Sequence, residues 1–236
     1  MHYRWIRVGG LAEVDPMVEA VLRRGRRRAV ERMAVAAAEY AALGWPVCLG
    51  AYAPDRPHHG ETPRACSCDR IGCPAPGAHP MSPAWQVQAT ADPVLVGRWW
   101  TARPRANVIL VTGRTFDVLD VPASAGTAAL AMMDRSAVRP GPVAISAGNR
   151  ALFFVATRGT PADEDEWWSC HLDCEPEVDL QAAGVRWHCR DSYVLAPPSR
   201  DGNALKAHWL RPPDGQSLPD GLRLLGFLAD ACEELA

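Results

Sequence analysis

The sequence lacks the features that mark membrane and secreted proteins. In its 236 residues no apolar run reaches the roughly 18 that a membrane-spanning helix needs, and its first residues do not resemble a signal peptide. Net charge is small, at −2 with histidine counted as neutral, which excludes a protein whose whole surface attracts polyanions. Internal repeats and low-complexity tails are missing too. We therefore expect a cytoplasmic protein without membrane contact, built as one large domain or as one domain with a small appendage.

Lysine is nearly absent as well, since Lys206 is the sole lysine among 25 basic residues. Six of the 24 arginines gather in the middle of a predicted helix over residues 11–43, whose apolar residues recur at helical spacing. A run of this kind contacts phosphates in some proteins, and more often it is a solvated helix face. Both interpretations stay open for six residues: Arg23, Arg24, Arg26, Arg27, Arg28 and Arg32.

The hydrophobic pattern divides the chain into an Arg-rich helical extension (1–34), a main domain (35–212) with an irregular, Pro-, Gly-, His- and Cys-rich insertion (53–84), and a C-terminal helix (213–236). Strands and helices interleave without strict alternation, which predicts an α/β (α+β) fold with a mixed sheet flanked by helices. Further helices are expected at 93–101, 124–137 and 219–235, and strands at 45–51, 107–113, 116–122, 143–147, 151–157, 178–180, 192–196 and 207–210.

The insertion contains a cluster with the spacing of metal ligands. Cys66, Cys68, Cys73 and His79 form Cys-x-Cys-x4-Cys-x5-His, and three thiolates with one imidazole complete a tetrahedral zinc shell. Because four protein ligands leave no open position, we expect a structural rather than a catalytic zinc. The insertion has no core of its own, so the metal would supply its ordering free energy. The alternative is a set of free surface thiols beside a fortuitous histidine.

A second group of thiols and histidines is less regular. Cys170, His171 and Cys174 precede residues 178–180, and His188 and Cys189 follow them. The two halves would meet if the intervening segment formed a hairpin, and they would then make a second metal site. Buried thiols beside a hydrogen-bonded histidine are the alternative.

Two acids lie within predicted strands. Asp120 stands near the end of the strand 116–122, and Asp179 lies between two apolar residues of the strand 178–180. A buried acid is costly without a metal or a cation beside it, and two acids from different strands can clamp a divalent ion for phosphoryl or nucleotidyl transfer. A capping or turn role is the alternative for Asp179. We expect Asp120→Asn to leave stability unchanged or improved, because the substitution removes a buried acid that has no partner.

Strand parity limits which neighbours can assist Asp120. Residue 122 shares its face, so a metal-binding Asp-x-Asp pair would need its second carboxylate there, but the residue is Pro122. Asp117 is three residues away and is expected on the opposite face. Near the other end of the chain, residues 193–199 end a strand in a Pro-Pro turn that we expect to display Ser199 and Arg200 to a phosphate.

Taken in order, these motifs resemble the bifunctional DNA primase/polymerase (prim-pol) domain, a branch of the archaeo-eukaryotic primase superfamily. The resemblance covers roughly residues 35–210. It rests on Ala41-Ala-Leu-Gly-Trp-Pro-Val47, the cluster from Cys66 to Pro80, Asn107-Val-Ile-Leu-Val-Thr-Gly113, Val118-Leu-Asp-Val121, Val178-Asp179, Tyr193-Val-Leu-Ala-Pro-Pro-Ser199 and Ala207-His-Trp209.

The resemblance implies a metal-dependent nucleotidyltransferase with two Mg²⁺ or Mn²⁺ ions held by an Asp-x-Asp or Asp-x-Glu pair and a later Asp, and with a His that contacts the nucleotide. By position, Asp120 is the first acid and Asp179 the later one. The second acid falls on Pro122 and the His on or next to Ala151, while Arg150 is placed to face a triphosphate. Changes to residues that only support a metal ligand typically lower metal affinity or activity ~10–100-fold, so loss of a ligand itself should lower them further.

Three hypotheses follow. The first is a weakened or inactive prim-pol domain that binds a nucleoside triphosphate, single-stranded DNA or a protein partner. The second is an active primase or polymerase with an altered metal shell. The third is a zinc-containing regulatory or interaction module, which a basic groove around Arg150, Arg200 and Lys206 would argue against.

Overall fold

The computed structural model describes residues 16–53, 66–68, 70–157, 184–203 and 205–235. Their helices are α1 (Pro16–Ala42), α2 (Trp85–Gln88), α3 (Pro93–Ala102), α4 (Ala123–Arg135) and α6 (Gly221–Glu233). Their strands are β1 (Val47–Gly50), β2 (Asn107–Val111), β3 (Asp117–Pro122), β4 (Val143–Ile145), β5 (Arg150–Val155), β6 (Arg186–His188), β7 (Tyr193–Leu195) and β8 (His208–Arg211).

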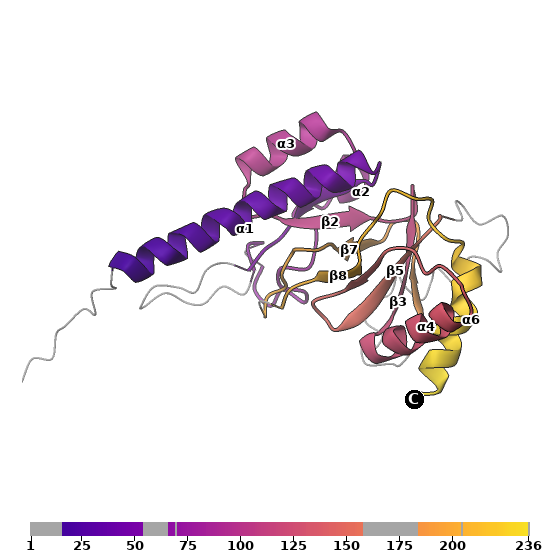
Figure 1. The fold of residues 1–236 in the computed structure, drawn as a ribbon. Coiled ribbons are helices and arrows are strands. Elements are labelled where there is room, and N and C mark those ends of the chain that lie inside the picture. The colour runs from indigo at the N-terminus through magenta and orange to yellow at the C-terminus, as the bar shows by residue number, and fades with distance from the viewer. Residues whose placement is uncertain (1–15, 54–65, 69, 158–183, 204, 236) are drawn as a thin grey trace, which may run out of the picture.

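The strands form two sheets with helices on their outer faces (Figure 1). One sheet has the order β1-β2-β7 and the other the order β6-β3-β5-β4-β8. The described strand pairs are all antiparallel, and a parallel contact is the isolated bridge between Ala156 and Asp220. Helices α1 and α3 lie over the smaller sheet, and α4 and α6 cover the far face of the larger one. This arrangement confirms the predicted α+β class.

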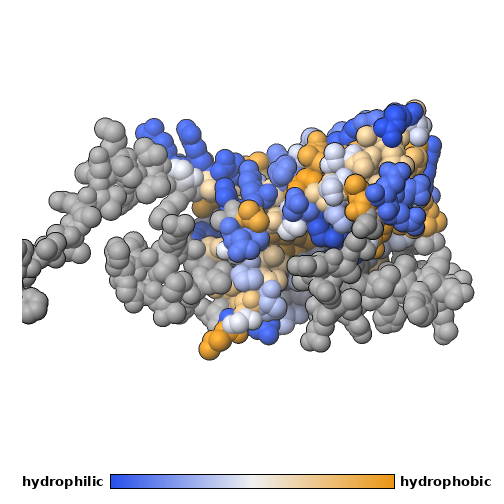
Figure 2. Space-filling view, turned by 90° about the horizontal axis from the view of Figure 1, so that it is seen from below, coloured by the Kyte–Doolittle hydropathy of each residue, from blue (hydrophilic) through white to orange (hydrophobic). Residues whose placement is uncertain are grey.

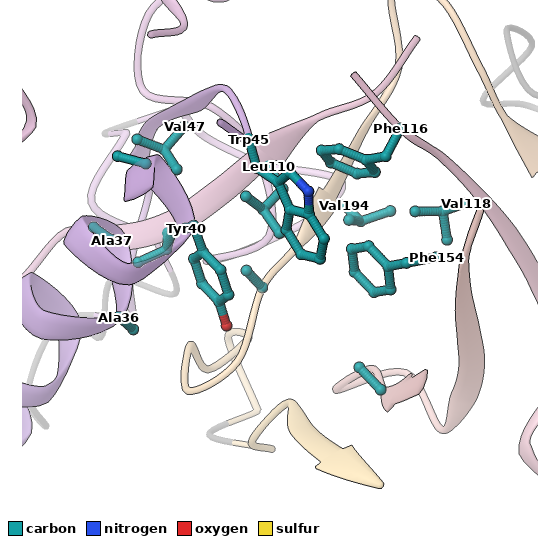
Figure 3. Close-up of a cluster of buried hydrophobic side chains, with 14 of the residues drawn as sticks. Ala36, Ala37, Tyr40, Trp45, Val47, Leu110, Phe116, Val118, Phe154 and Val194 are labelled. Carbon is teal, nitrogen blue, oxygen red and sulfur yellow. The ribbon is translucent and has the colours of Figure 1, made fainter. Parts of the chain in front are cut away.

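The main core lies between α1 and the facing surfaces of both sheets, and aromatic rings fill it (Figure 3). Trp45 is its centre: its ring lies 6.0 Å from that of Tyr40, 4.8 Å from that of Phe116 and 5.1 Å from that of Phe154. All four rings are buried. Stacked and tilted rings of this kind add to the free energy of apolar burial. Trp45, three residues after the end of α1, therefore fixes this helix to Phe154 of β5.

Local signals set most of the element ends. Asp92 caps α3 by accepting a hydrogen bond from Val94 N at 2.8 Å, and Pro93 occupies the first helical position. Gly44, with a φ of +76°, ends α1 in the left-handed region that glycine tolerates. The short elements α2 and β6 were not predicted. The predicted strand at 178–180 lies outside the described residues.

The expected boundary between an N-terminal extension and the main domain, at residues 34 and 35, falls inside α1. Its first turns reach beyond the sheets, while its last turns pack in the core through Ala36, Ala37 and Tyr40. On the face seen in Figure 2, hydrophobic and hydrophilic residues are interspersed. Among the described residues, no helix has both the length and the apolar character needed to cross a bilayer.

Candidate functional site

Asp120 lies on β3, which runs between β5 and β6 in the larger sheet. The antiparallel register places it opposite Leu152 on one side and Arg186 on the other. It shares a face with Val118, which belongs to the main core, so its carboxylate points into the space between the two sheets. The residue is 6% exposed.

An arginine and a histidine side chain meet this carboxylate. Arg150 Nε donates to Asp120 Oδ1 at 2.5 Å, and His188 Nε2 lies 3.2 Å from Asp120 Oδ2. Arg150 also donates through Nη2 to the carbonyls of Asp120 and Gly184, each at 3.1 Å. His188 is oriented from its other side by Ser192, whose Oγ lies 2.9 Å from Nδ1. Each carboxylate oxygen of Asp120 therefore has a side-chain partner, which offsets the cost of burying the charge.

Among the described residues, the positions beside Asp120 offer no second acid. Pro122 stands directly opposite Arg150 in the β3–β5 ladder, so the residue that lacks a ligand atom faces the residue that carries a cation. Asp117 lies on the other face of β3, where its Oδ2 accepts a hydrogen bond from the indole of Trp187 at 3.2 Å. This confirms the prediction from strand parity that Asp117 and Asp120 diverge.

A pair of divalent cations needs several carboxylates around a shared space. The described residues bring one carboxylate to this position and fill its surroundings with a guanidinium and an imidazole. Asp179, the expected later acid, lies outside the described residues. The part of the site that the structure describes therefore does not fit a two-metal clamp. A triphosphate contact by Arg150, as expected from its position, would require its pair with Asp120 to open.

The Cys3His cluster, made of Cys66, Cys68, Cys73 and His79, is assembled as the spacing predicted. Its donor atoms all lie within 4.8 Å of one another. This spread fits a tetrahedral shell with Zn–S bonds near 2.3 Å, in which ligand atoms stand roughly 4 Å apart. The cluster can therefore bind a metal ion of this kind.

Groups around the Cys3His cluster prepare its ligands. His79 Nδ1 lies 2.7 Å from the carbonyl of Pro80, which accepts a hydrogen bond from Nδ1–H and leaves Nε2 as the ligand atom. Gly77 N donates to Cys66 Sγ at 3.3 Å. The backbone N–H of Arg70 lowers the pKa of the Cys68 thiol to about 7, whereas burial raises the pKa of Cys73 to about 11. Of these two thiols, Cys68 is the one that ionises more readily near neutral pH.

A single buried amide ties the Cys3His cluster to the sheet. Asn107 Nδ2, at the start of β2, lies 2.9 Å from the carbonyl of Ala51, 2.7 Å from that of Gly77 and 2.6 Å from that of Arg200. A second link runs from Gly202 N to the carbonyl of Pro76 at 2.5 Å. The loop at 73–80, which carries two of the cluster's ligands, and the turn after β7 are thus held against each other and against β2.

The turn after β7 differs from its expected role. Ser199 is fully buried, and its Oγ accepts a hydrogen bond from Val108 N at 2.8 Å. The hydroxyl is thus used to join the turn to β2 and is not displayed to a phosphate. Arg200 is exposed, and its backbone N donates to Asn107 Oδ1 at 3.3 Å. The sequence alone did not reveal that β2 would present backbone groups at this point.

The second thiol and histidine group is only partly described, because Cys170, His171 and Cys174 lie outside the described residues. Of its other half, His188 points to Asp120, whereas Cys189 is buried in the cluster beneath α4 and α6. These two neighbours thus diverge. Within the described ranges, the Cys3His cluster is the group whose ligand atoms converge.

Comparison with known families decides the classification. The model of the family described as bifunctional DNA primase/polymerase, N-terminal, matches residues 37–221, which is more than half of the chain. The chain belongs to this family. The prim-pol match begins inside α1 and ends where α6 begins, so it includes both sheets, the Asp120 position and the Cys3His cluster. A search of the curated proteins found no match to the chain.

Within this prim-pol domain, two contacts of Asp120 were not predicted from the sequence. Arg150 and Asp120 are 30 residues apart, and His188 and Asp120 are 68 apart. A partial signal existed for the first, since Arg150 follows the Gly148-Asn149 turn and begins an apolar strand. The second had none, because β6 is three residues long and its histidine resembled a metal ligand.

Proposed function

We propose that this prim-pol domain is catalytically weakened or inactive. It binds a nucleoside triphosphate or single-stranded nucleic acid but does not synthesise or extend a primer. The observation that carries the proposal is the ion pair between Arg150 and Asp120. The guanidinium provides, from within the chain, the positive charge that a metal would bring to the carboxylate.

The free-energy cost of admitting a divalent ion to Asp120 supports this proposal. A divalent ion that approaches Asp120 would have to break a buried ion pair and would then lie beside the charge of Arg150. Breaking such a pair by removing one partner costs about 3–5 kcal/mol in other proteins, and repulsion between like charges adds to this. With Pro122 in place of a ligand, no carboxylate on β3 compensates on this face.

We propose also that the Cys3His cluster holds a structural Zn²⁺. The four donors, the carbonyl behind His79 and the N–H directed at Cys66 Sγ support this assignment. Its part in the proposed function is to keep the loop at 73–80 against the turn at 199–202, through the contacts of Asn107 and Gly202.

The test measures binding of labelled ribo- and deoxynucleoside triphosphates and of labelled oligo(dT), with Mg²⁺, with Mn²⁺ and with chelator, beside primer synthesis and primer extension on single-stranded DNA. Binding of either ligand without product supports the proposal. Metal-dependent product would overturn it in favour of an active enzyme with an altered metal shell. Absence of binding to both ligands would overturn it in favour of a protein-interaction module.

A further inference from the structure

A row of three arginines runs along the solvent-facing part of α1. Arg24, Arg28 and Arg32 are all exposed and are spaced four residues apart. Residues at this spacing lie on one ridge of a helix, about 6 Å from one to the next. The ridge is a local concentration of positive charge on a chain whose net charge is −2. It lies before residue 37, outside the segment that the family match covers.

The arginine ridge leads directly into a groove. The same row continues as Ala36 and Tyr40, and both line a cavity of about 530 Å³ between α1 and the opposite wall. That wall is formed by Pro197, Pro198 and Trp209. Arg28 and Arg32 line the groove as well, so its entrance is basic and its inner part is aromatic and apolar.

The polar atoms at the bottom of the groove already have partners. Tyr40 donates its hydroxyl to the carbonyl of Pro197 at 2.6 Å and accepts the indole N–H of Trp209 at 3.1 Å. Burial also raises the pKa of Tyr40, so the hydroxyl stays neutral. What the groove offers to a ligand is therefore ring surface and proline, while the ridge beside it offers guanidinium groups.

We infer that this ridge and groove form a binding surface for single-stranded nucleic acid, with phosphates on Arg24, Arg28 and Arg32 and an unstacked base in the groove beside Trp209. The inference rests on the proposed function and adds to it the place where the strand lies. A basic track followed by an aromatic platform is the combination that single strands use, since every base has a face that stacks. The surface is separate from the Asp120 site.

Two acids also line the groove and bear on its charge. Glu31 is paired with Arg27 at 3.0 Å, so its charge is offset on the helix itself. Glu39 faces the same groove and opposes an approaching phosphate. The surface therefore carries its positive charge at the ridge end, and Glu39→Gln should strengthen binding.

The first test removes the ridge charge. The variant R24Q/R28Q/R32Q is compared with a triple variant of equal charge change on exposed arginines elsewhere, R98Q/R135Q/R223Q. Arginine and glutamine have similar helix propensity, so α1 should persist. Binding of labelled oligo(dT) is measured across a salt series. Three lost phosphate contacts should reduce the slope of log K against log salt by about 2 and weaken binding roughly 10–100-fold at physiological salt.

The second test addresses the groove. Val35 lines it and is 55% exposed, so V35E places an acid there without disturbing the core. Val94, on α3, is 62% exposed and provides the control V94E. Weaker oligo(dT) binding by V35E alone, together with preference for a single strand over a duplex of the same length, supports the groove. If strand and duplex bound equally well and V35E had no effect on binding, the groove would have no role in binding the strand.

The outcomes also separate this inference from the proposed function. If wild type binds oligo(dT) and the ridge triple variant binds equally well with the same salt slope, the inference is wrong and the strand lies elsewhere on an intact nucleic-acid-binding domain. If the wild-type chain binds no oligo(dT), the inference is wrong. If the wild-type chain then still bound labelled nucleoside triphosphate, the proposed function would stand without this inference.

Discussion

Arg150 Nε lies 2.5 Å from Asp120 Oδ1, and this contact joins the first residue of β5 to the middle of β3. The exposed fractions of the two side chains are 15% and 8%. The contact changes the expected effect of removing the acid. An unpartnered Asp120 would have been replaceable by Asn at no cost, but a buried acid paired with Arg150 and His188 is not.

Asp120→Asn should therefore destabilise the protein by about 3 kcal/mol, because it leaves Arg150 with a buried charge that has lost its counter-ion. Chemical denaturation gives the free energy of unfolding. The control is Asp134→Asn, whose pair with Arg211 is exposed and worth about 0–1 kcal/mol. If the two variants had equal stability, the Asp120 pair would contribute nothing in solution.

Replacing Pro122 and Arg150 together should open the site to a metal. The variant P122D/R150A places two carboxylates on one face of β3 and removes the competing cation, so we expect a gain of Mn²⁺ binding, read from the loss of the free Mn²⁺ signal in electron paramagnetic resonance. P122D alone should gain little, because Arg150 can pair with either acid. Equal Mn²⁺ binding by wild type and the double variant would contradict this.

Removal of zinc should destabilise the domain. We expect one zinc per chain by elemental analysis and a fall in Tm of roughly 10 °C or more in excess chelator, because the metal would hold Cys66, Cys68, Cys73 and His79 together. Cys73→Ser should lose the zinc, while Cys232→Ser, which lies outside the cluster, should keep it. A melting curve that chelator does not change, with no zinc in the protein, would show that the Cys3His cluster holds none.

Asn107→Ala should weaken zinc binding without touching a ligand. The substitution removes the donor shared by the carbonyls of Ala51, Gly77 and Arg200, which should cost about 3 kcal/mol of stability. The loop that contains Gly77 is then less well held, so zinc affinity should fall about 10–100-fold, as for second-shell changes. Competition with a zinc indicator measures this. Exposed Asn203→Ala is the control, and equal affinities for the two variants would exclude the link.

Features with a short-range cause were predictable from the sequence. The start of α3 follows from Asp92 and Pro93, the Cys3His cluster from its spacing, and the opposite orientations of Asp117 and Asp120 from strand parity. Features that depend on which strands pair were not. The contacts of Arg150 and His188 with Asp120, and the burial of Ser199 against Val108, are set by sheet register between distant segments.

The continuity of α1 has a geometric consequence. The helix runs without interruption from Pro16 to Ala42, so Arg24 and Tyr40 stand about 24 Å apart along its axis, at 1.5 Å per residue. Its last turns are anchored in the core, which holds that separation constant. The helix therefore fixes the distance between the arginine contacts and the groove contacts for any strand that lies along it. Oligonucleotides too short to reach both ends would lose one set of contacts entirely, and affinity would rise in a step with length, independent of base sequence.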